Sequence, residues 1–380
     1  MKNYCQAESV KLIHHGKTYF AELERLIAEA KEVIHLQVYI LEEDETGRQV
    51  IASLKQAAHR GVKVFLLADG FGSKGLSRKT KNEMLQSGIR FRLFSPLFSS
   101  ESIFLGRRLH HKIVVADRRT AMVGGINISD KYRGTANERA WLDYAVRING
   151  EVCGYLHLLC ERIFHRRSYK RIVDYPCPSG LAGGVNVRFR RNDWIIGKTD
   201  TYLSYKNAFA MAERSIIIAG SYFLPGHSLR RAMKRAVRRG VRIKVILAGK
   251  SDLPFFRLAE KYLYNFLTRN KVEVYEWHDS VMHGKAIVVD SKWASVGSYN
   301  VNYLSRYWSI ELNADIDNRD FAETFHRHLE EVMNTRCRKI TWKSLHRGIL
   351  TRFWHWIAYQ YYKWLLRLLL PIKSRGNIRE

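Results

Sequence analysis

The first half of the chain alternates between amphipathic stretches with a helical period and short apolar runs that are typical of buried strands. In order, the pattern predicts a strand from about residue 10, helices over 19–31 and 47–60, and strands over 33–40, 62–67 and 89–94. Gly61 ends the second helix and leads directly into an apolar strand. This succession predicts an α/β unit, with a parallel or mixed sheet and helices on its faces.

The same succession returns in the second half of the chain. It predicts strands over 185–189, 215–219, 241–245 and 271–277, and helices over 201–213 and 229–238. A cluster of Pro and Gly over 175–184 separates the two halves. We therefore expect an N-terminal domain over 1–178 and a C-terminal domain over 179–336, each a complete α/β unit, followed by a tail over 337–380.

One motif occurs twice in the same register. The first copy contains His110, Lys112, Asp117, Gly124 and Asn127, and the second contains His283, Lys285, Asp290, Gly297 and Asn300. Every residue of the second copy follows its counterpart by 173 positions, so no insertion separates the two registers. A single His-x-Lys on a strand edge usually belongs to an ordinary surface strand, but a duplication with unchanged spacing indicates a shared function.

Each copy predicts a small constellation of polar side chains. Residues i and i+2 of a strand point to the same face, so the imidazole and the ammonium of each copy project together. The turn after each strand, and the apolar strand that follows it, bring Asn127 or Asn300 back beside the starting histidine. Cationic and amide donors suit the non-bridging oxygens of a phosphodiester, and imidazoles suit nucleophilic attack and proton transfer. The motif therefore predicts a site for phosphodiester chemistry.

The charge of the chain favours polyanionic partners. The 380 residues include 64 Lys and Arg against 36 Asp and Glu, a formal charge of +28. Such an excess attracts nucleic acid or an anionic membrane surface, and charge alone does not choose between them. The basic stretches 162–171 and 230–239 are each compatible with a solvated helix face or with a phosphate-facing surface.

The cysteines and the apolar runs indicate the cellular compartment of the protein. The five cysteines, which have no Cys-x-x-Cys spacing, are Cys5, Cys153, Cys160, Cys177 and Cys337. We therefore expect a reducing compartment, and neither a disulfide framework nor a structural zinc site. Residues 1–15 lack the apolar core of a signal peptide, and no run of about 18 apolar residues requires a spanning helix. These features favour a cytoplasmic, surface-associated protein.

The tail contains an aromatic amphipathic stretch over 351–370. At about 100° per residue, one stripe collects Trp354, Ile357, Tyr361, Leu365 and Leu368, and Arg352, Lys363 and Arg367 lie roughly opposite. This pattern predicts a helix that lies in the headgroup region of a membrane. The alternative is a helix that packs its aromatic stripe onto the protein.

The paired His-x-Lys-x4-Asp-x6-Gly-Gly/Ser-x-Asn motifs resemble those of the phospholipase D superfamily. The segments 219–226, 263–267 and 311–313 are similar to the bacterial cardiolipin synthases, in particular the shorter B-type without N-terminal transmembrane helices. The resemblance extends from about residue 10 to residue 335. It implies two phospholipase D-like α/β sandwich domains related by pseudo-twofold symmetry, each a mixed β-sheet flanked by helices, with both motifs around one phosphate.

The resemblance also implies a role for each motif residue. His110 would attack phosphorus to form a phosphatidyl-histidine, and His283 would protonate the departing alkoxide and then deprotonate the incoming alcohol. The non-bridging oxygens would be held by Lys112, Lys285, Asn127 and Asn300. Asp117 and Asp290 complete the catalytic signature, but their place at the far ends of their strands predicts structural turn or ion-pair residues. No metal and no cofactor is expected.

A nucleophilic histidine needs a carboxylate on its other ring nitrogen, which fixes the tautomer. In the family this carboxylate follows the motif histidine along the chain; here Asp143 follows His110 by 33 residues and Glu311 follows His283 by 28. We therefore expect Asp143 to support His110 and Glu311 to support His283. The first copy departs from the family pattern at Gly125, where Ser is common, and so lacks one hydroxyl donor.

The function that the resemblance implies is phosphatidyl transfer between phospholipids. Phosphatidylglycerol would be the acceptor in making cardiolipin, and phosphatidylethanolamine is a candidate donor beside phosphatidylglycerol. The protein would be peripheral, on the cytoplasmic face of the cell membrane, and bound to its anionic surface. One alternative is a phospholipase D-type phosphodiesterase or nuclease, against which the aromatic tail argues. A basic nucleic-acid-binding protein without activity is a third, against which the intact His and Lys of both copies argue.

Overall fold

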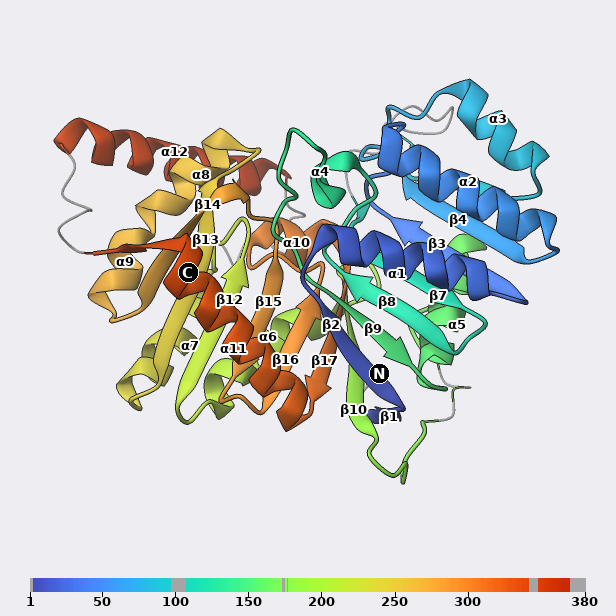
Figure 1. Ribbon diagram of the computed structural model, residues 1–380. Helices are drawn as coiled ribbons and strands as arrows, with labels where there is room; N and C mark the ends of the chain where they lie inside the picture. Colours follow the sequence, from blue (N-terminus) through green and yellow to red (C-terminus); the bar gives the residue numbers. More distant parts are fainter. Residues whose placement is uncertain (1–2, 97–106, 173–174, 176, 342–347, 370–380) are drawn as a thin grey trace.

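Two mixed β-sheets with helices on their faces form the framework of the protein (Figure 1). The computed structural model describes residues 3–96, 107–172, 175, 177–341 and 348–369. The first sheet has the strand order β2-β9-β8-β7-β3-β4-β5. The main path of the second is β1-β10-β17-β16-β15-β12-β13-β14-β18. The predicted α/β class is confirmed.

The first sheet is built from the N-terminal half. Its strands are β2 (Ser9–Ile13), β3 (Val33–Val38), β4 (Lys63–Asp69), β5 (Arg90–Phe94), β7 (Lys112–Ala116), β8 (Thr120–Gly124) and β9 (Ala145–Asn149). The helices of this half are α1 (Gly16–Glu29), α2 (Glu45–His59), α3 (Arg78–Gln86), α4 (Asp130–Arg133) and α5 (Cys153–Phe164).

The second sheet is built mainly from the C-terminal half. Its strands are β1 (Cys5–Ala7), β6 (Arg108–Leu109), β10 (Val185–Asp193), β11 (Lys198–Thr199), β12 (Ser215–Gly220), β13 (Arg242–Lys250), β14 (Glu273–Val281), β15 (Lys285–Val289), β16 (Trp293–Gly297), β17 (Ser309–Asp317) and β18 (Cys337–Ile340). The helices are α6 (Asp200–Met211), α7 (His227–Arg238), α8 (Pro254–Tyr262), α9 (Tyr264–Arg269), α10 (Tyr303–Tyr307), α11 (Arg319–Arg336) and α12 (Ile349–Leu369).

The two sheets share one topology, as the duplicated motif predicts. β3 pairs in parallel with β4 and antiparallel with β7, and β12 pairs in parallel with β13 and antiparallel with β15. The registers agree, since Leu36 faces Val114 in the first sheet and Ile218 faces Ile287 in the second. Val114 and Ile287 are separated by the same 173 positions as the two motifs. The chain is therefore a duplicated α/β unit.

The core lies in three layers. Helices α1 and α2 cover the outer face of the first sheet, where Leu23 and Val64 are buried, and α6 and α7 cover the second sheet in the same way. The layer between the sheets joins both halves, because Val123 of β8, Val296 of β16 and Phe325 of α11 belong to one buried cluster. Strands that are covered on both faces read as continuous apolar runs, which is why the central strands were predictable.

Three short strands do not follow the predicted division of the chain. β1 pairs with β10 and β6 pairs with β17, so both join the sheet of the C-terminal half. β18, at the start of the predicted tail, pairs with β14. The predicted N-terminal domain and the predicted tail therefore both contribute strands to the sheet of the C-terminal half, and the bounds at 178 and 336 stay a prediction.

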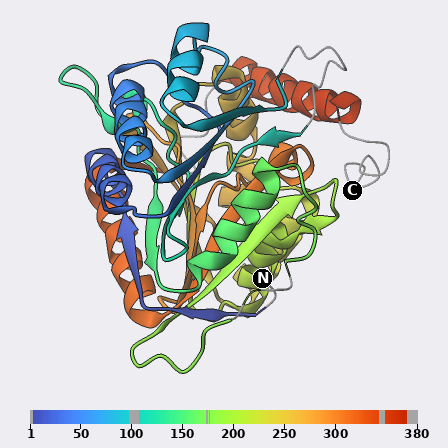
Figure 2. The ribbon, with the colours of Figure 1, turned by 90° about the vertical axis from the view of Figure 1, so that its right-hand side faces the viewer.

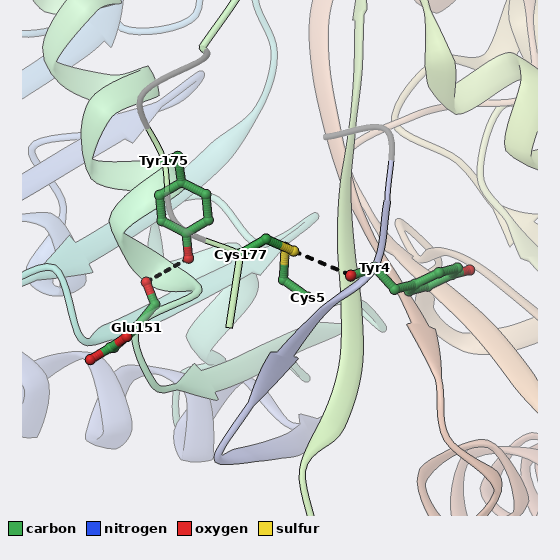
Figure 3. The surroundings of a disulfide bond; sticks show 5 residues. All are labelled: Tyr4, Cys5, Glu151, Tyr175 and Cys177. Carbon is green, nitrogen blue, oxygen red and sulfur yellow. Dashed lines mark hydrogen bonds between the residues drawn. A yellow bond between two sulfur atoms is a disulfide. The ribbon is translucent and has the colours of Figure 1, made fainter. Parts of the chain in front are cut away.

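A disulfide joins Cys5 to Cys177, whose positions differ by 172 (Figure 3). The expectation that the cysteines form no structural disulfide is therefore wrong for this pair. β1 pairs with β10, and the Gln6 N–H donates to the Pro178 carbonyl at 2.8 Å, which brings the two cysteines together only in the folded chain. Cys153, Cys160 and Cys337 are free.

Loss of this disulfide should lower stability, because the bond closes a long loop in the unfolded chain. We expect Cys177→Ser to reduce the free energy of unfolding by about 2–4 kcal/mol under non-reducing conditions, measured by urea denaturation. Cys337→Ser is the control and should have a smaller effect. Equal stability of oxidised wild type and Cys177→Ser would show that the bond contributes nothing.

Candidate active site

Both motifs begin just before a buried strand. β7 begins at Lys112, two residues after His110, and β15 begins at Lys285, two residues after His283. Each strand turns into an antiparallel partner, β8 or β16, that runs back toward the histidine. The return strands end at Gly124 and Gly297, and the motif asparagines follow three residues later.

Asp117 and Asp290 lie at the opposite ends of these strands and hold the backbone. The carboxylate of Asp117 accepts from the N–H groups of residues 31, 32 and 33 at 2.8–2.9 Å. The carboxylate of Asp290 accepts from residues 213, 214 and 215 at 2.7–2.8 Å. Each aspartate therefore fixes the start of the neighbouring central strand, β3 or β12. Both carboxylates therefore hold the backbone, as the position of the two residues predicted, and their inclusion among the catalytic residues stays a prediction.

Each motif histidine is bonded to a carboxylate of the other half. Nδ1 of His110 lies 2.9 and 3.0 Å from the two carboxylate oxygens of Glu311, which is fully buried. Nδ1 of His283 lies 2.6 Å from Oδ2 of Asp143. The expected pairing, Asp143 with His110 and Glu311 with His283, is therefore wrong. The reciprocal contact is the pattern that a pseudo-twofold axis between two halves produces.

Backbone pairing between the halves explains the exchange. Leu109, just before His110, pairs with Ile310, just before Glu311, and the His110 N–H donates to the Ile310 carbonyl at 3.0 Å. In the other half the His283 N–H donates to the Leu142 carbonyl at 2.8 Å, one residue before Asp143. The segment before each histidine therefore pairs with a segment of the other half, and this pairing places the histidine beside the carboxylate of that half.

The contact between Asp143 and His283 also requires a glycine at position 125. A Cβ at position 125 would lie 2.3 Å from Oδ1 of Asp143, so the side chain of a serine would collide with the carboxylate that holds His283. In the other copy Ser298 donates its hydroxyl to Oε2 of Glu311 at 2.6 Å. The departure from the family pattern at Gly125 therefore has a steric cause.

The ionisable groups of the site are buried together, and burial moves their pKa values. Burial lowers the pKa of Lys112 to about 7 and that of Lys285 to about 8, and for Lys112 the charge of Lys285 adds to the effect. Burial also lowers the pKa of His110 and of His283 and raises that of Asp143 to about 6. At neutral pH the substrate-free site therefore favours the uncharged form of both imidazoles, as a nucleophile requires.

The two motif asparagines differ in their contacts. Oδ1 of Asn127 accepts from the Ile40 N–H, and its Nδ2 donates to the Tyr132 hydroxyl at 2.7 Å. Oδ1 of Asn300 accepts from the Ser221 hydroxyl at 3.0 Å, and no bond from its Nδ2 to a described residue is found. Asn300 therefore has its amide donors available for a ligand, whereas Asn127 uses one of them to hold Tyr132.

Three tyrosines border the histidines and were not foreseen from the sequence. The hydroxyl of Tyr132, on α4, lies 3.4 Å from Nε2 of His283. The ring of Tyr39 lies edge-on to His110 with ring centroids 5.0 Å apart, and that of Tyr222 lies edge-on to His283 at 6.1 Å. Tyr132 follows Asn127 by five residues, but the repeat places Ser305 at the matching position. The repeat therefore gave no indication that Tyr132 belongs to the site.

The arrangement suits transfer of a phosphoryl group through a histidine. It supplies two uncharged imidazoles with carboxylates on Nδ1 and two lysines that donate to the backbone carbonyls of His110 and His283. Within the described ranges, no group of three His, Cys, Asp or Glu side chains could hold a metal ion.

Comparison with known proteins identifies similar sequences and folds. The family model described as "Cardiolipin synthase, PLD-like domain" matches residues 23–156 and 205–333. "Cardiolipin synthase B" of Escherichia coli (strain K12) is 34% identical over 361 residues, which cover 91% of this chain and 87% of that protein. "Probable cardiolipin synthase YwiE" of Bacillus subtilis (strain 168) is 29% identical and covers 86% of this chain and 66% of that protein.

Two solved structures have a similar fold. The phosphatidylserine synthase of Haemophilus influenzae Rd KW20 superposes with a TM-score of 0.77 at 15% identity, over 97% of this chain and 95% of that one. The polyphosphate kinase of Porphyromonas gingivalis superposes with a TM-score of 0.62 at 16% identity, over 95% of this chain and 54% of that one. At these identities the likeness is one of fold, and it spans both halves.

The buried lysines predict a stability that rises with pH. The pKa of Lys112 is about 7 in the folded protein and 10.5 in its ordinary state, so between these values the unfolded chain binds more protons. From pH 7 to about 9.5, Lys112 should therefore add about 1–3 kcal/mol to the free energy of unfolding. Urea denaturation at both pH values should show a smaller rise in Lys112→Met than in wild type. The exposed-lysine control Lys63→Met should keep the full rise; an equal rise in all three would contradict the assignment.

Proposed function

Because the chain belongs to the cardiolipin synthase family of phospholipase D-like proteins, we propose that it transfers a phosphatidyl group from a donor phospholipid to phosphatidylglycerol. The observation that carries this proposal is the pair of His-Lys-Asn sets whose histidines are each held by a carboxylate of the other half. The donor is phosphatidylglycerol itself or phosphatidylethanolamine.

The reaction has two steps through one covalent intermediate. The negative phosphate of the bound donor favours a protonated His283, which then carries a proton on both ring nitrogens. Nε2 of His110 attacks phosphorus, the bond to the donor headgroup oxygen breaks, and His283 gives that oxygen its Nε2 proton. His283 then takes the proton of the phosphatidylglycerol hydroxyl, whose oxygen attacks the phosphatidyl-histidine and releases His110. Lys112, Lys285 and the amide of Asn300 stabilise the charge on the non-bridging oxygens. Glu311 and Asp143 fix the tautomers, since each accepts from Nδ1 and leaves Nε2 for the substrate.

The organisation of the chain and its location belong to the same proposal. Residues 1–178 and 179–336 form the two phospholipase D-like units. Within the 337–380 tail, α12 is the membrane-interfacial part, since β18 belongs to the second sheet. The protein acts as a peripheral protein on the anionic, cytoplasmic face of the cell membrane. No described helix is long and apolar enough to cross a bilayer.

Product analysis tests the reaction. Purified protein is incubated with vesicles of phosphatidylglycerol, with and without phosphatidylethanolamine, and the lipids are analysed by mass spectrometry. We expect cardiolipin from wild type and from His59→Ala, a substitution of an exposed histidine on α2, and at least about a 10³-fold loss in His110→Ala. The lipid dependence of the product identifies the donor.

Other products would support the alternatives. Phosphatidic acid without cardiolipin would identify a phospholipase D-type hydrolase. Absence of any lipid product, together with cleavage of single- or double-stranded DNA by wild type but not by His110→Ala, would identify a nuclease.

Because each carboxylate contacts the histidine of the other half, substitutions of Glu311 and Asp143 should affect different steps of the reaction. A phosphatidyl ester of p-nitrophenol has a leaving group that needs no proton, so its first step depends on His110 and not on His283. We expect Glu311→Gln to slow release of p-nitrophenol by about 10²–10⁴-fold. Asp143→Asn should release the first equivalent of p-nitrophenol at nearly the wild-type rate and then accumulate the phosphatidyl adduct, detected by mass spectrometry of the denatured protein. If each carboxylate served the histidine of its own half, the two variants would exchange behaviours.

A further inference from the structure

Helices α8 and α12 expose a group of large apolar side chains. These residues are between 38% and 62% exposed, and we call them the aromatic platform: Leu253, Phe255 and Leu258 at α8, and Phe353, Trp354, Trp356, Tyr361 and Trp364 on α12. The two sets are continuous, since the rings of Phe255 and Tyr361 lie 5.1 Å apart. A contiguous apolar surface of this kind marks an interaction site.

Helix α12 has two apolar faces with different environments. Ala358, Tyr362 and Leu366, which recur every four residues, are buried in a cluster with Ala259 and Leu263 of the α8–α9 segment. The platform side chains of α12 lie on the opposite side, at about 100° per residue. The helix therefore packs onto the protein with a face other than the predicted stripe, and Trp354 and Tyr361 of that stripe stay exposed.

The chemistry of the platform suits a lipid bilayer. Trp and Tyr are the side chains that prefer the membrane interface, and cations next to them are attracted by anionic lipids. Residues 349–369 contain no Asp or Glu, and the same stretch contains Arg352, Lys363 and Arg367. The whole chain carries a formal charge of +28. An anionic bilayer complements both the rings and the charge, as it does for helices that lie in the interface.

Ring contacts connect the platform to the catalytic centre. Tyr362 of α12 packs edge-on against Phe256 at 5.2 Å, Phe256 against Tyr222 at 5.3 Å, and Tyr222 against His283 at 6.1 Å. The Tyr222 hydroxyl also donates to Asp252, next to Leu253, at 2.6 Å. Both views place α12 and α8 side by side along one edge of the molecule (Figures 1 and 2).

We propose that the aromatic platform of α8 and α12 is the surface by which the protein docks onto an anionic bilayer, with the His283 side of the active site presented to the lipids. The proposal rests on the proposed function, since it identifies where that site meets its substrate. It extends the tail hypothesis to α8, which the sequence did not single out. The rings of Tyr362, Phe256 and Tyr222 connect α12 to His283, so docking of α12 positions the site at the lipid surface.

Vesicle binding tests the surface. The variants are Leu253→Ser with Phe255→Ser on α8, and Trp354→Ser with Trp356→Ser on α12; the matched control is Leu85→Ser with Met211→Ser, two side chains that are 53% and 63% exposed elsewhere. Sedimentation with phosphatidylglycerol/phosphatidylcholine vesicles should show binding weakened on the order of tenfold or more in each platform variant and unchanged in the control. Wild-type binding by both platform variants, or an equal loss in the control, would overturn the proposal.

Activity assays separate docking from catalysis. With a short-chain phosphatidylglycerol kept monomeric in solution, the platform variants should turn over substrate at the wild-type rate, and with vesicles they should lose activity in proportion to binding. Equal loss on both substrates would overturn the docking role, since it would place the defect in the site. If wild type makes no lipid product on either substrate while binding still depends on the platform, the proposed function fails and the docking surface stands.

Discussion

Each motif histidine is oriented by a carboxylate that the other half of the chain supplies, and the active site depends on this exchange. His110 reaches Glu311 because β6 pairs with β17, and His283 reaches Asp143 because the segments before the two residues pair in the same way. Neither half can therefore form a complete site alone. The duplicated fold provides one centre at the interface between its halves, which is the advantage of keeping both copies in one chain.

Burial of ionisable groups at the interface between the halves changes their pKa values. Lys112, Lys285 and Asp143 leave water together, so the pKa values of these three groups move toward neutrality and proton transfer becomes feasible near pH 7. The same crowding makes the two copies unequal. Asp143 leaves no room for a side chain at Gly125, and Asn127 donates to Tyr132, whereas Ser298 donates to Glu311 and the Asn300 amide donates to no described residue. The inequality offers a physical basis for assigning different roles to the two histidines.

The proposed docking surface depends on how α12 packs. α12 buries Ala358, Tyr362 and Leu366 and thereby fixes its other face outward, beside the exposed side chains of α8. The helix is therefore both part of the folded protein and a surface for a partner. The ring of Tyr222 lies between this surface and the catalytic centre, in edge-on contact with Phe256 and His283.

The sequence by itself determined the α/β units, the approximate bounds of their strands and helices, and the identity of the motif residues. These follow from local information, namely the hydrophobic period, the turn residues and a repeat of unchanged spacing. The structural role of Asp117 and Asp290 was also accessible, because a strand fixes which end of the motif each residue occupies.

Only the tertiary structure decided which carboxylate serves which histidine, where the chain crosses between sheets, and that Cys5 bonds to Cys177. Tyr132 and Tyr222 likewise became part of the site only through contacts between distant segments. Spacing along the chain measures neighbours within one half, whereas the interface brings together residues whose separation of up to about 200 positions has no period. That physical difference, between local pattern and long-range contact, separates what could be predicted from what could not.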